Sequence, residues 1–351
     1  MVPAKLVLET GEIFHGISPS WQQETTFGEV VFNTGMVGYP ETMTDPSYNG
    51  QLITFTYPLM GNYGVGNCES WESAKIHAKG IIVSELSPHY ARSNAEQSLL
   101  SWCEAENIPV IANIDTRALT KCLREKGVVA GAITTADELP KAFPDNNARN
   151  LVAEVSIKEP ATFGSGDKLI IAVDCGMKEN IIRELRNLPV RVKRVPYNYD
   201  YTNEHFDGVF ISNGPGNPAR CYETTNILRK AMEQEKPIFG ICLGSQLMGL
   251  AINATTYKLR FGHRSQNQPC LQEGTDRCFL TSQNHGYAIN EDSLPEDWRV
   301  SFRNLNDNTV QGIEHNTKPF FSVQFHPEAA PGPVDTHWLF NNFYQLIREG
   351  N

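Results

Sequence analysis

The chain has 351 residues, a formal net charge of -10 and a hydrophobic content of 40%. This length favours two domains, and the ordinary composition indicates a globular protein with a sizeable core. The negative charge argues against nucleic acid as the main partner. No apolar run approaches the roughly 18–20 residues that span a membrane, so a membrane partner is not expected either.

The first part of the chain is expected to be strand-rich. A turn at Thr10-Gly11-Glu12 predicts a hairpin after the first of four apolar runs that predict strands, at residues 5–9, 28–33, 51–56 and 80–84. Apolar positions at helical spacing predict two helices, at residues 95–107 and 116–126. Gly127 follows the second helix and is expected to cap it.

A change in composition separates two regions of the chain. The stretch Phe163-Gly164-Ser165-Gly166-Asp167 is rich in glycine and polar residues, which is typical of a linker. We therefore predict an N-terminal domain over residues 1–155, a linker over 156–167 and a second domain over 168–351.

The second domain shows alternating strand and helix patterns. Strands are expected at residues 169–174, 191–195, 208–212 and 237–241, and helices at 179–187, 223–235 and, closing the chain, 335–349. This alternation predicts an α/β fold with right-handed βαβ units on a mainly parallel, doubly wound sheet. Ligands of such sheets bind at the carboxyl ends of the strands.

The segment Gly240-Ile241-Cys242-Leu243-Gly244 follows the last of these strands and precedes a helical pattern at residues 246–251. Strand, sharp turn and helix are the geometry of a nucleophile elbow, and the glycines leave room for a strained turn. A cysteine at a helix N-terminus is favoured as the thiolate. Taken alone, Cys242 would be a small buried hydrophobic residue, as most free cysteines are.

Far downstream, His326-Pro327-Glu328 offers a general base and a carboxylate to orient it. A cysteine, a histidine and a carboxylate together favour covalent acyl chemistry.

These motifs together resemble the class I (triad) glutamine amidotransferases. More narrowly, nearly the whole chain is similar to the small, glutamine-hydrolysing part of carbamoyl phosphate synthase. In the N-terminal half the narrower match rests on GEVVFNTGM at 28–36, TDPSY at 44–48, GNYG at 61–64 and DTR at 115–117. In the C-terminal half it rests on SNGPG at 212–216, QNHGYA at 283–288 and PGP at 331–333.

The resemblance implies roles for individual residues. Cys242 would be the nucleophile, His326 the base and then the acid, and Glu328 the orienting carboxylate. The backbone N–H groups of Gly214 and Leu243 would form an oxyanion hole. Glutamine would be held by Ser47, Gly214, Gly216, Leu243, Gln246, Asn284, Gly286 and Tyr287. Because Ser47 belongs to the N-terminal domain, we expect the site at the domain interface.

The resemblance also implies a partner. No cofactor and no metal site are expected on this chain, whereas ATP and magnesium would act on a large synthetase, either a separate subunit or the continuation of a longer polypeptide. That partner would receive ammonia through a closed path and make carbamoyl phosphate for pyrimidine or arginine synthesis. The scattered cysteines form no Cys-x-x-Cys pair, so we expect reduced thiols in a cytoplasmic protein without zinc.

Two positions depart from the family pattern. Ser245 stands where the family usually has histidine after the second glycine of the elbow, and Ser265 stands where glycine is common. Neither belongs to the triad, so the expected effects are on helix packing, on the rate of hydrolysis or on coupling to the partner. His263 and His285 are expected to be structural, since His326 has its own carboxylate.

Three other interpretations stay open at this point. The chain resembles, less closely, triad amidotransferases that serve GMP, CTP or anthranilate synthesis. It is also compatible with a cysteine hydrolase that acts on γ-glutamyl amides without a partner. A non-catalytic interaction module with the same fold is the third, although it would not need Cys242 and His326.

Overall fold

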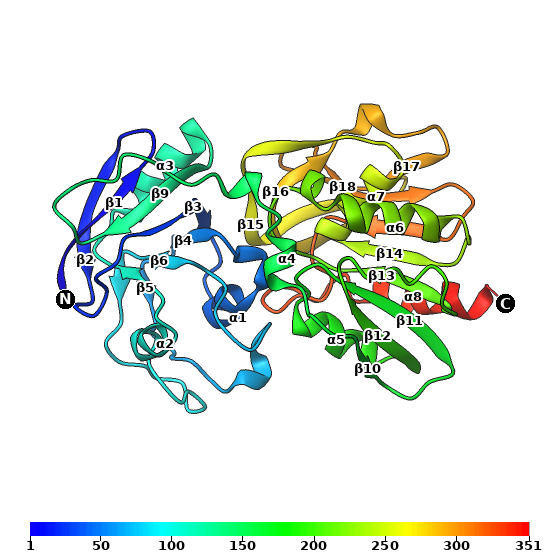
Figure 1. Ribbon diagram of the computed structural model, residues 1–351, viewed down its shortest axis with the longest axis horizontal. Coiled ribbons are helices and arrows are strands. Elements are labelled where there is room, and N and C mark those ends of the chain that lie inside the picture. Colours follow the sequence, from blue (N-terminus) through cyan, green and yellow to red (C-terminus); the bar gives the residue numbers. More distant parts are fainter. Residues whose placement is uncertain (351) are drawn as a thin grey trace. The chain divides into compact units, whose positions relative to one another are not determined.

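The computed structural model describes residues 1–350, which divide into two compact units. The first unit comprises Met1–Arg149, and the second begins at Asn150. Each unit has a large sheet of its own, as Figure 1 shows. The α/β class with a strand-rich N-terminal part, predicted from the sequence, is confirmed.

The sheet of the first unit has seven strands in the order β2-β1-β9-β3-β4-β6-β8. Their bounds are β1 (Val2–Leu8), β2 (Ile13–Ser18), β3 (Thr26–Asn33), β4 (Gln51–Phe55), β6 (Gly80–Ile82), β8 (Val110–Ile111) and β9 (Val129–Thr134). Strands β3, β4, β6 and β8 are parallel, and the remaining neighbours are antiparallel. The predicted turn joins β1 to β2, where Gly11 has a φ of 99° that favours glycine. Strands β5 (Leu59–Met60) and β7 (Glu85–Leu86) form a separate parallel pair.

Helices cover both faces of this sheet, and Figure 1 shows α2 and α3 on opposite sides of it. The helices are α1 (Tyr39–Thr44), α2 (Leu99–Ala105) and α3 (Thr116–Lys126), and the 3-10 turns are η1 (Pro46–Tyr48), η2 (Cys68–Ser70) and η3 (Asn146–Ala148). Val31, Ile53 and Ile81 belong to the same buried cluster as Trp102 of α2. Their neighbours in the strands point to the other face because side chains alternate along a strand. The sheet is therefore buried on both faces.

Local capping decides where the helices of this unit begin. Helix α3 has the predicted bounds, and the Asp115 side chain accepts a hydrogen bond from the Ala118 N–H at its start. Helix α2 is shorter than predicted because Ser98 caps it, its side chain accepting from the Ser101 N–H. Gln97, expected to be helical, instead forms a β-bridge with Val65.

The sheet of the second unit has ten strands in the order β10-β12-β11-β13-β14-β19-β18-β17-β15-β16. Their bounds are β10 (Ala161–Phe163), β11 (Lys168–Asp174), β12 (Val190–Pro196), β13 (Gly208–Ile211), β14 (Ile238–Ile241), β15 (Thr256–Gln272), β16 (Cys278–Ile289), β17 (Trp298–Asn304), β18 (Val310–His315) and β19 (Phe320–Val323). The stretch from β12 to β19 is parallel, as predicted. Antiparallel strands extend it at both ends, so the complete sheet is mixed.

Helices α6 and α7 cover one face of this sheet and α5 and α8 the other, as Figure 1 shows. The helices are α4 (Val152–Val155), α5 (Glu179–Arg186), α6 (Tyr222–Met232), α7 (Leu243–Ala251) and α8 (Trp338–Glu349), with short 3-10 turns η4 (Pro218–Arg220) and η5 (Glu291–Ser293). Leu228 and Leu247 belong to one core, and Leu185 and Phe343 to the other. The predicted helices lie within a few residues of these bounds.

Residues 156–167, predicted as a linker, include a strand of the second unit. Strand β10 pairs antiparallel with β12, Phe163 lying opposite Val192. A Cβ on Gly164 would lie 2.4 Å from the Val190 carbonyl oxygen, so glycine here permits close backbone approach. The composition that suggested flexibility therefore reflects packing at a sheet edge.

The order of the parallel strands brings several loops to one edge of the sheet. The chain passes from β11 to β12 on one side, and then adds β13, β14 and β19 on the other. Such a reversal is a topological switch point, where ligands bind at the carboxyl ends of the strands. The loops after β11, β13, β14 and β19 carry Lys178, Gly214, Cys242 and His326.

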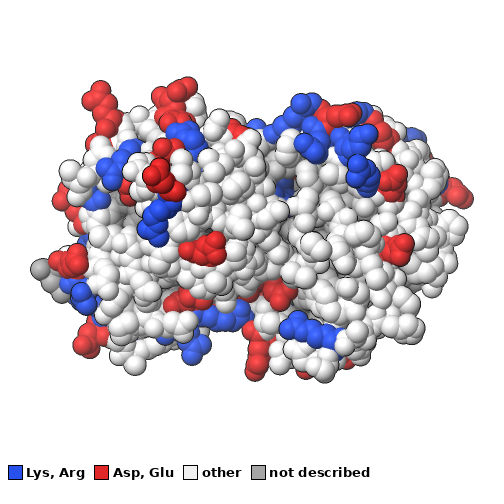
Figure 2. Space-filling model, turned by 180° about the vertical axis from the view of Figure 1, so that it is seen from behind, with Lys and Arg blue, Asp and Glu red and all other residues white. Residues whose placement is uncertain are grey.

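The surface is of mixed charge. On the face shown in Figure 2, acidic side chains lie among the basic ones. Within residues 1–350, none of the helices is both long and apolar enough to cross a membrane.

Replacing Phe239 on β14 tests the packing that supports the predicted elbow. Its buried ring stacks on Phe321 at 4.4 Å and meets Phe210 edge to face at 5.3 Å. We expect Phe239→Ala to lower the free energy of unfolding, measured by urea denaturation, by about 3–5 kcal/mol. Tyr222→Ala, at a residue that is 65% exposed, should change it by less than about 0.5 kcal/mol. Equal effects of the two changes would contradict this account of the core.

Candidate active site

Cys242 lies between β14 and α7 with a strained backbone. Its φ of 55° and ψ of -103° are rare for a residue with a side chain. Such a conformation costs about 1–3 kcal/mol and persists only where the surroundings enforce it. The nucleophile elbow predicted from the sequence is therefore present as a geometric feature.

The two glycines of the elbow are required by close contacts. A Cβ on Gly244 would lie 2.2 Å from the carbonyl oxygen of Ile211, at the end of neighbouring β13. A Cβ on Gly240 would lie 2.7 Å from the carbonyl oxygen of Gly244. These distances leave no room for a side chain, so the spacing of the glycines follows from backbone packing around the turn.

Hydrogen bonds hold Cys242 between two strands. Its N–H donates to the Val323 carbonyl of β19 at 2.8 Å. Its Sγ donates to the Asn284 carbonyl of β16 at 3.6 Å, and the residue is 2% exposed. The thiol therefore lies against a residue that the family resemblance assigns to glutamine binding.

His326 and Glu328 form a buried pair in the loop that follows β19. Nδ1 of His326 lies 2.6 Å from Oε1 of Glu328, and both residues are almost fully buried. The backbone N–H of His326 donates to the Ser282 carbonyl at 2.9 Å, which fixes the backbone that carries the ring. With Nδ1 occupied by the carboxylate, Nε2 is the buried ring atom left for proton transfer.

The charges of this pair shift both pKa values. Burial alone would lower the pKa of His326, but the charges of Glu328 and Cys242 raise it to about 10. Burial alone would raise the pKa of Glu328, but the charges of Lys178 and His326 lower it to about 2. His326 is therefore an imidazolium and Glu328 a carboxylate at neutral pH.

These shifts set the pH window in which the pair stabilises the fold. The contribution of His326, whose pKa is raised from 6.5, is complete below that value and is lost as pH rises through about 10. The contribution of Glu328, whose pKa is lowered from 4.5, is complete above that value and is lost as pH falls through about 2. Both contributions are complete between pH 4.5 and 6.5.

Lys178 and Asn180 complete the surroundings of Glu328, and sequence reasoning did not find either of them. Lys178, 3% exposed, donates from Nζ to Oε1 of Glu328 at 3.1 Å and to the Ala329 carbonyl. Asn180 Nδ2 donates to the Glu328 carbonyl. The available signal was position, because both residues follow β11 at the edge where Cys242 lies.

The predicted oxyanion-hole residues are neighbours. A Cβ on Gly214 would lie 2.0 Å from the Cys175 carbonyl oxygen and 2.8 Å from Leu243 Cδ2, so the loop after β13 packs against the start of α7. The Gly244 N–H donates to the Ser212 carbonyl at 3.0 Å and joins the two segments. Gly216, with a φ of 88°, packs instead toward Leu151.

Gln246 joins α7 to two strands. Its Nε2 donates to the Tyr287 carbonyl at 3.0 Å and to Oε1 of Gln324 at 3.1 Å. Two predicted glutamine-binding residues, Gln246 and Tyr287, are thus in contact. Asn284 and Gly286 lie on the same strand, β16.

Ser47 is the one predicted site residue in the first unit. It lies in the 3-10 turn η1, is 5% exposed, and its N–H donates to Oδ1 of Asp45 at 2.8 Å. Its part in the site remains a prediction.

The two departures from the family pattern have local partners. Ser245 Oγ lies 2.8 Å from Ser322 Oγ, a buried hydrogen bond between α7 and β19. Ser265 Oγ accepts from Gln268 Nε2 at 2.8 Å. Ser245 therefore joins two elements of the second unit, whereas the hydrogen bond of Ser265 is local to β15.

His263 and His285 form a separate buried network. Nδ1 of His263 lies 3.2 Å from Nε2 of His285, and Nε2 of His263 lies 2.7 Å from Oδ2 of Asp307. Burial and the charge of His263 hold the pKa of His285 well below its usual range. A neutral His285 ring that links two strands agrees with the structural role expected for this residue from the sequence.

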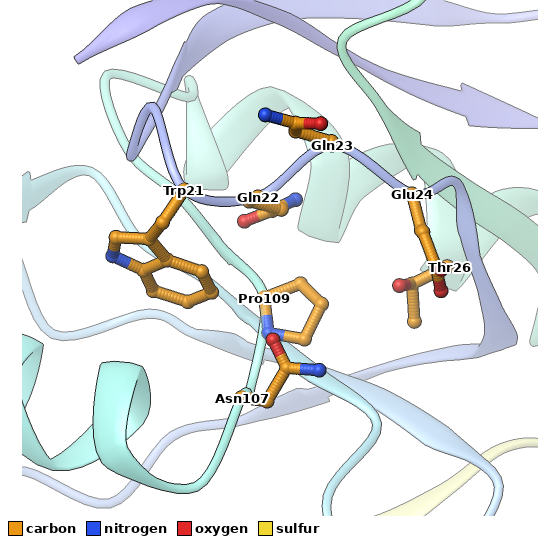
Figure 3. A pocket seen from close by; sticks show the side chains of 7 residues that line it. All are labelled: Trp21, Gln22, Gln23, Glu24, Thr26, Asn107 and Pro109. Atoms are coloured by element: carbon orange, nitrogen blue, oxygen red, sulfur yellow. The ribbon is translucent and has the colours of Figure 1, made fainter.

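The first unit has a separate polar pocket of about 280 Å³ (Figure 3). It is lined by Trp21, Gln22, Gln23, Glu24, Thr26, Asn107 and Pro109. This set contains no cysteine or histidine, so the pocket lacks the two residue types on which the predicted chemistry depends. Among residues 1–350 no cluster of three or more His, Cys, Asp or Glu side chains is placed to hold a metal ion.

Replacing Lys178 tests how much the buried ion pair with Glu328 contributes to stability. Replacing it in Lys178→Met removes one partner of Glu328 and should lower the free energy of unfolding by about 3–5 kcal/mol. The matched control is Lys318→Met, because Lys318 pairs with Glu235 at 2.9 Å on the surface and should lose at most about 1 kcal/mol. Urea denaturation at pH 7 measures both variants. A Lys178→Met variant as stable as the control would exclude a stabilising role for the buried lysine.

Comparisons with known proteins cover both units. Residues 171–346 match the family glutamine amidotransferase class-I, and residues 6–133 match the carbamoyl-phosphate synthase small chain, CPSase domain. The chain is 49% identical over 359 residues to the multifunctional protein CAD of Squalus acanthias, covering 99% of this chain and 16% of that protein.

A second relative is matched over most of its own length. The carbamoyl phosphate synthase arginine-specific small chain of Aspergillus oryzae is 45% identical over 363 residues, covering 99% of this chain and 80% of that protein. Among solved structures, a putative GMP synthase subunit from Thermoplasma acidophilum is 26% identical, covers 52% of this chain and 95% of that one, and has a TM-score of 0.46. By its matches to both family domains and to the Aspergillus oryzae small chain, the chain belongs to the carbamoyl phosphate synthase small-chain family.

Proposed function

We propose that this chain is the glutaminase component of a glutamine-hydrolysing carbamoyl phosphate synthase. It hydrolyses L-glutamine to glutamate and ammonia and delivers the ammonia to a large synthetase partner. The observation that carries the proposal is the strained Cys242 elbow beside the buried His326–Glu328 pair. The first unit also matches the carbamoyl-phosphate synthase small chain.

In the first half of the reaction, the Cys242 thiolate attacks the carboxamide carbon of glutamine. The developing oxyanion is stabilised by the backbone N–H groups of Gly214 and Leu243, and one such donor contributes about 3–4 kcal/mol. The imidazolium of His326 donates its Nε2 proton to the leaving nitrogen, and ammonia departs from the γ-glutamyl thioester.

In the second half, His326 is neutral and acts as the base. It takes a proton from water, the resulting hydroxide attacks the thioester, and glutamate leaves Cys242 as the thiolate. Glu328 stays ionised throughout, because the charges of Lys178 and His326 outweigh its burial and lower its pKa to about 2. Its carboxylate accepts a hydrogen bond from Nδ1, which orients the ring and stabilises the imidazolium.

The partner carries the rest of the reaction. Ammonia released into neutral water becomes ammonium and loses its nucleophilicity, so a closed path to the synthetase is needed. ATP and magnesium act on the partner, which combines bicarbonate and ammonia into carbamoyl phosphate for arginine or pyrimidine synthesis. A cytoplasmic location is part of the same proposal.

The first test is glutamate release from L-glutamine by the chain, alone and with a large carbamoyl phosphate synthetase chain, ATP and bicarbonate. Cys242→Ser should lower turnover by about 10³-fold or more, because a serine hydroxyl is a far weaker nucleophile here. Cys278→Ser, at an exposed cysteine, serves as the matched control and should retain activity. A Cys242→Ser variant with wild-type turnover would exclude the proposed nucleophile, and no stimulation by the synthetase would favour a free-standing hydrolase.

The pH dependence tests the role of Glu328. In Glu328→Gln the charge that raises the pKa of His326 is absent, so that pKa should fall below about 10. The alkaline limb of kcat/KM and the NMR titration of the His326 ring should both move to lower pH. Glu314→Gln, which loses an exposed partner of Arg299, should leave both unchanged. An unmoved His326 titration in Glu328→Gln would contradict the proposed electrostatic role.

A further inference from the structure

Arg264 lies directly across from the strand that contacts the nucleophile. It is on β15 and is 5% exposed, and its partner in the antiparallel register is Asn284 of β16. The carbonyl of Asn284 is the group to which the Cys242 thiol donates. Arg264 therefore lies opposite the residue whose carbonyl accepts the hydrogen bond of the Cys242 thiol.

The side chain of Arg264 lies on the same sheet face as two predicted glutamine contacts. Residues directly opposite each other in antiparallel strands point to the same face, so Arg264 shares a face with Asn284. Gly286, two residues further along β16, belongs to that face as well. A Cβ on Gly286 would lie 3.4 Å from an Nη2 of Arg264, which places the guanidinium beside this position.

The local backbone is shaped around this guanidinium. The register shifts between Lys258 and His263, and within that bulge the Phe261 carbonyl accepts a hydrogen bond from Arg264 Nη1 at 2.9 Å. A Cβ on Gly262 would lie 2.4 Å from the same Nη1 atom and 2.5 Å from the His285 carbonyl oxygen. Gly262 has a φ of 68°, so a glycine leaves the space that the guanidinium occupies.

The charge of Arg264 meets a chemical need of the predicted site. Glutamine carries an α-carboxylate at the end opposite to its reacting carboxamide. The residues that the family resemblance assigns to glutamine binding are serine, glycine, leucine, glutamine, asparagine and tyrosine, all of which are neutral. His285, close enough for the charge of Arg264 to lower its pKa further, is itself held neutral. A planar guanidinium is the side chain best matched to a carboxylate.

We propose that Arg264 is a substrate-binding residue whose guanidinium pairs with the α-carboxylate of glutamine. This inference rests on the proposed glutaminase function and adds the group that distinguishes an α-amino acid from a simple amide. It predicts that Arg264 contributes to KM far more than to kcat, because the α-carboxylate takes no part in bond breaking.

The test compares two substrates in Arg264→Met. For L-glutamine, KM should rise about 10- to 100-fold while kcat changes by less than about threefold. For 4-aminobutanamide, which has the same amine and carboxamide but no carboxylate, the variant should keep the wild-type kcat/KM. Arg299→Met, at an exposed arginine on β17, is the matched control and should change neither substrate.

Two results would overturn the inference. An unchanged KM for L-glutamine would show that Arg264 does not contact the substrate. Equal losses for both substrates would show that it acts by holding the β15 bulge in place, as a positioning residue. If circular dichroism shows that Arg264→Met does not fold, Arg264→Lys is measured with the same two substrates instead. Its KM for L-glutamine should be higher than that of the wild type, while its kcat/KM for 4-aminobutanamide should be unchanged.

Failure of the proposed function has a different signature. A wild-type protein that hydrolyses no glutamine, alone or with the synthetase, would remove the function itself. A wild-type protein that hydrolyses glutamine while Arg264→Met retains its KM would remove only the role of Arg264.

Discussion

The buried charges of Lys178, Glu328 and His326 are the constraint around which the second unit is organised. Taking ionised groups out of water costs several kcal/mol each unless they are paired and hydrogen-bonded. Here the carboxylate of Glu328 lies 2.6 Å from one cation and 3.1 Å from the other. The three charges come from loops after β11 and β19, which are far apart in sequence. The parallel strand order that brings these loops to one sheet edge is therefore what makes the charged cluster tolerable.

The same edge also carries the backbone strain of Cys242. A residue in this conformation needs enforcement from its surroundings, and the contacts of Gly244 with Ile211 and of the Cys242 N–H with Val323 supply it. Strands β13 and β19 flank β14, so the turn is held from both sides. The cost of the strain and of the buried charge is offset by the two apolar cores on either face of the sheet.

Much of this arrangement could be predicted from local pattern. Helix α3 was predicted to the residue because its helical pattern is local and ends at Gly127. The elbow was predicted because two glycines around a cysteine, between a strand and a helix, are typical of that turn. Helix α2 was predicted too long for two reasons. The local cap at Ser98 was overlooked, and the bridge of Gln97 with Val65 is a long-range contact that the sequence does not display.

The parts that could not be predicted depend on pairing at long range. The hairpin of β15 and β16 was not recognised, since its register shifts and polar residues hide the alternation of a strand. Lys178 resembles any surface lysine in sequence, and only its place after β11 buries it against Glu328. Linker-like glycines at 164 and 166 likewise proved to be packed against neighbouring backbone.

Strand β16 shows how one element serves two purposes through its period of two. Thr281, Gln283 and His285 lie on one face, where Gln283 Oε1 contacts His285 Nε2 at 3.0 Å and His285 in turn contacts His263. Asn284 and Gly286 lie on the other face, with Arg264 beside them. The first face ties the strand to β15 through neutral polar groups, while the second carries residues that we propose to bind glutamine. A one-residue slip in register would exchange the two sets of side chains, so the buried histidine network also fixes the position of the groups that face Cys242.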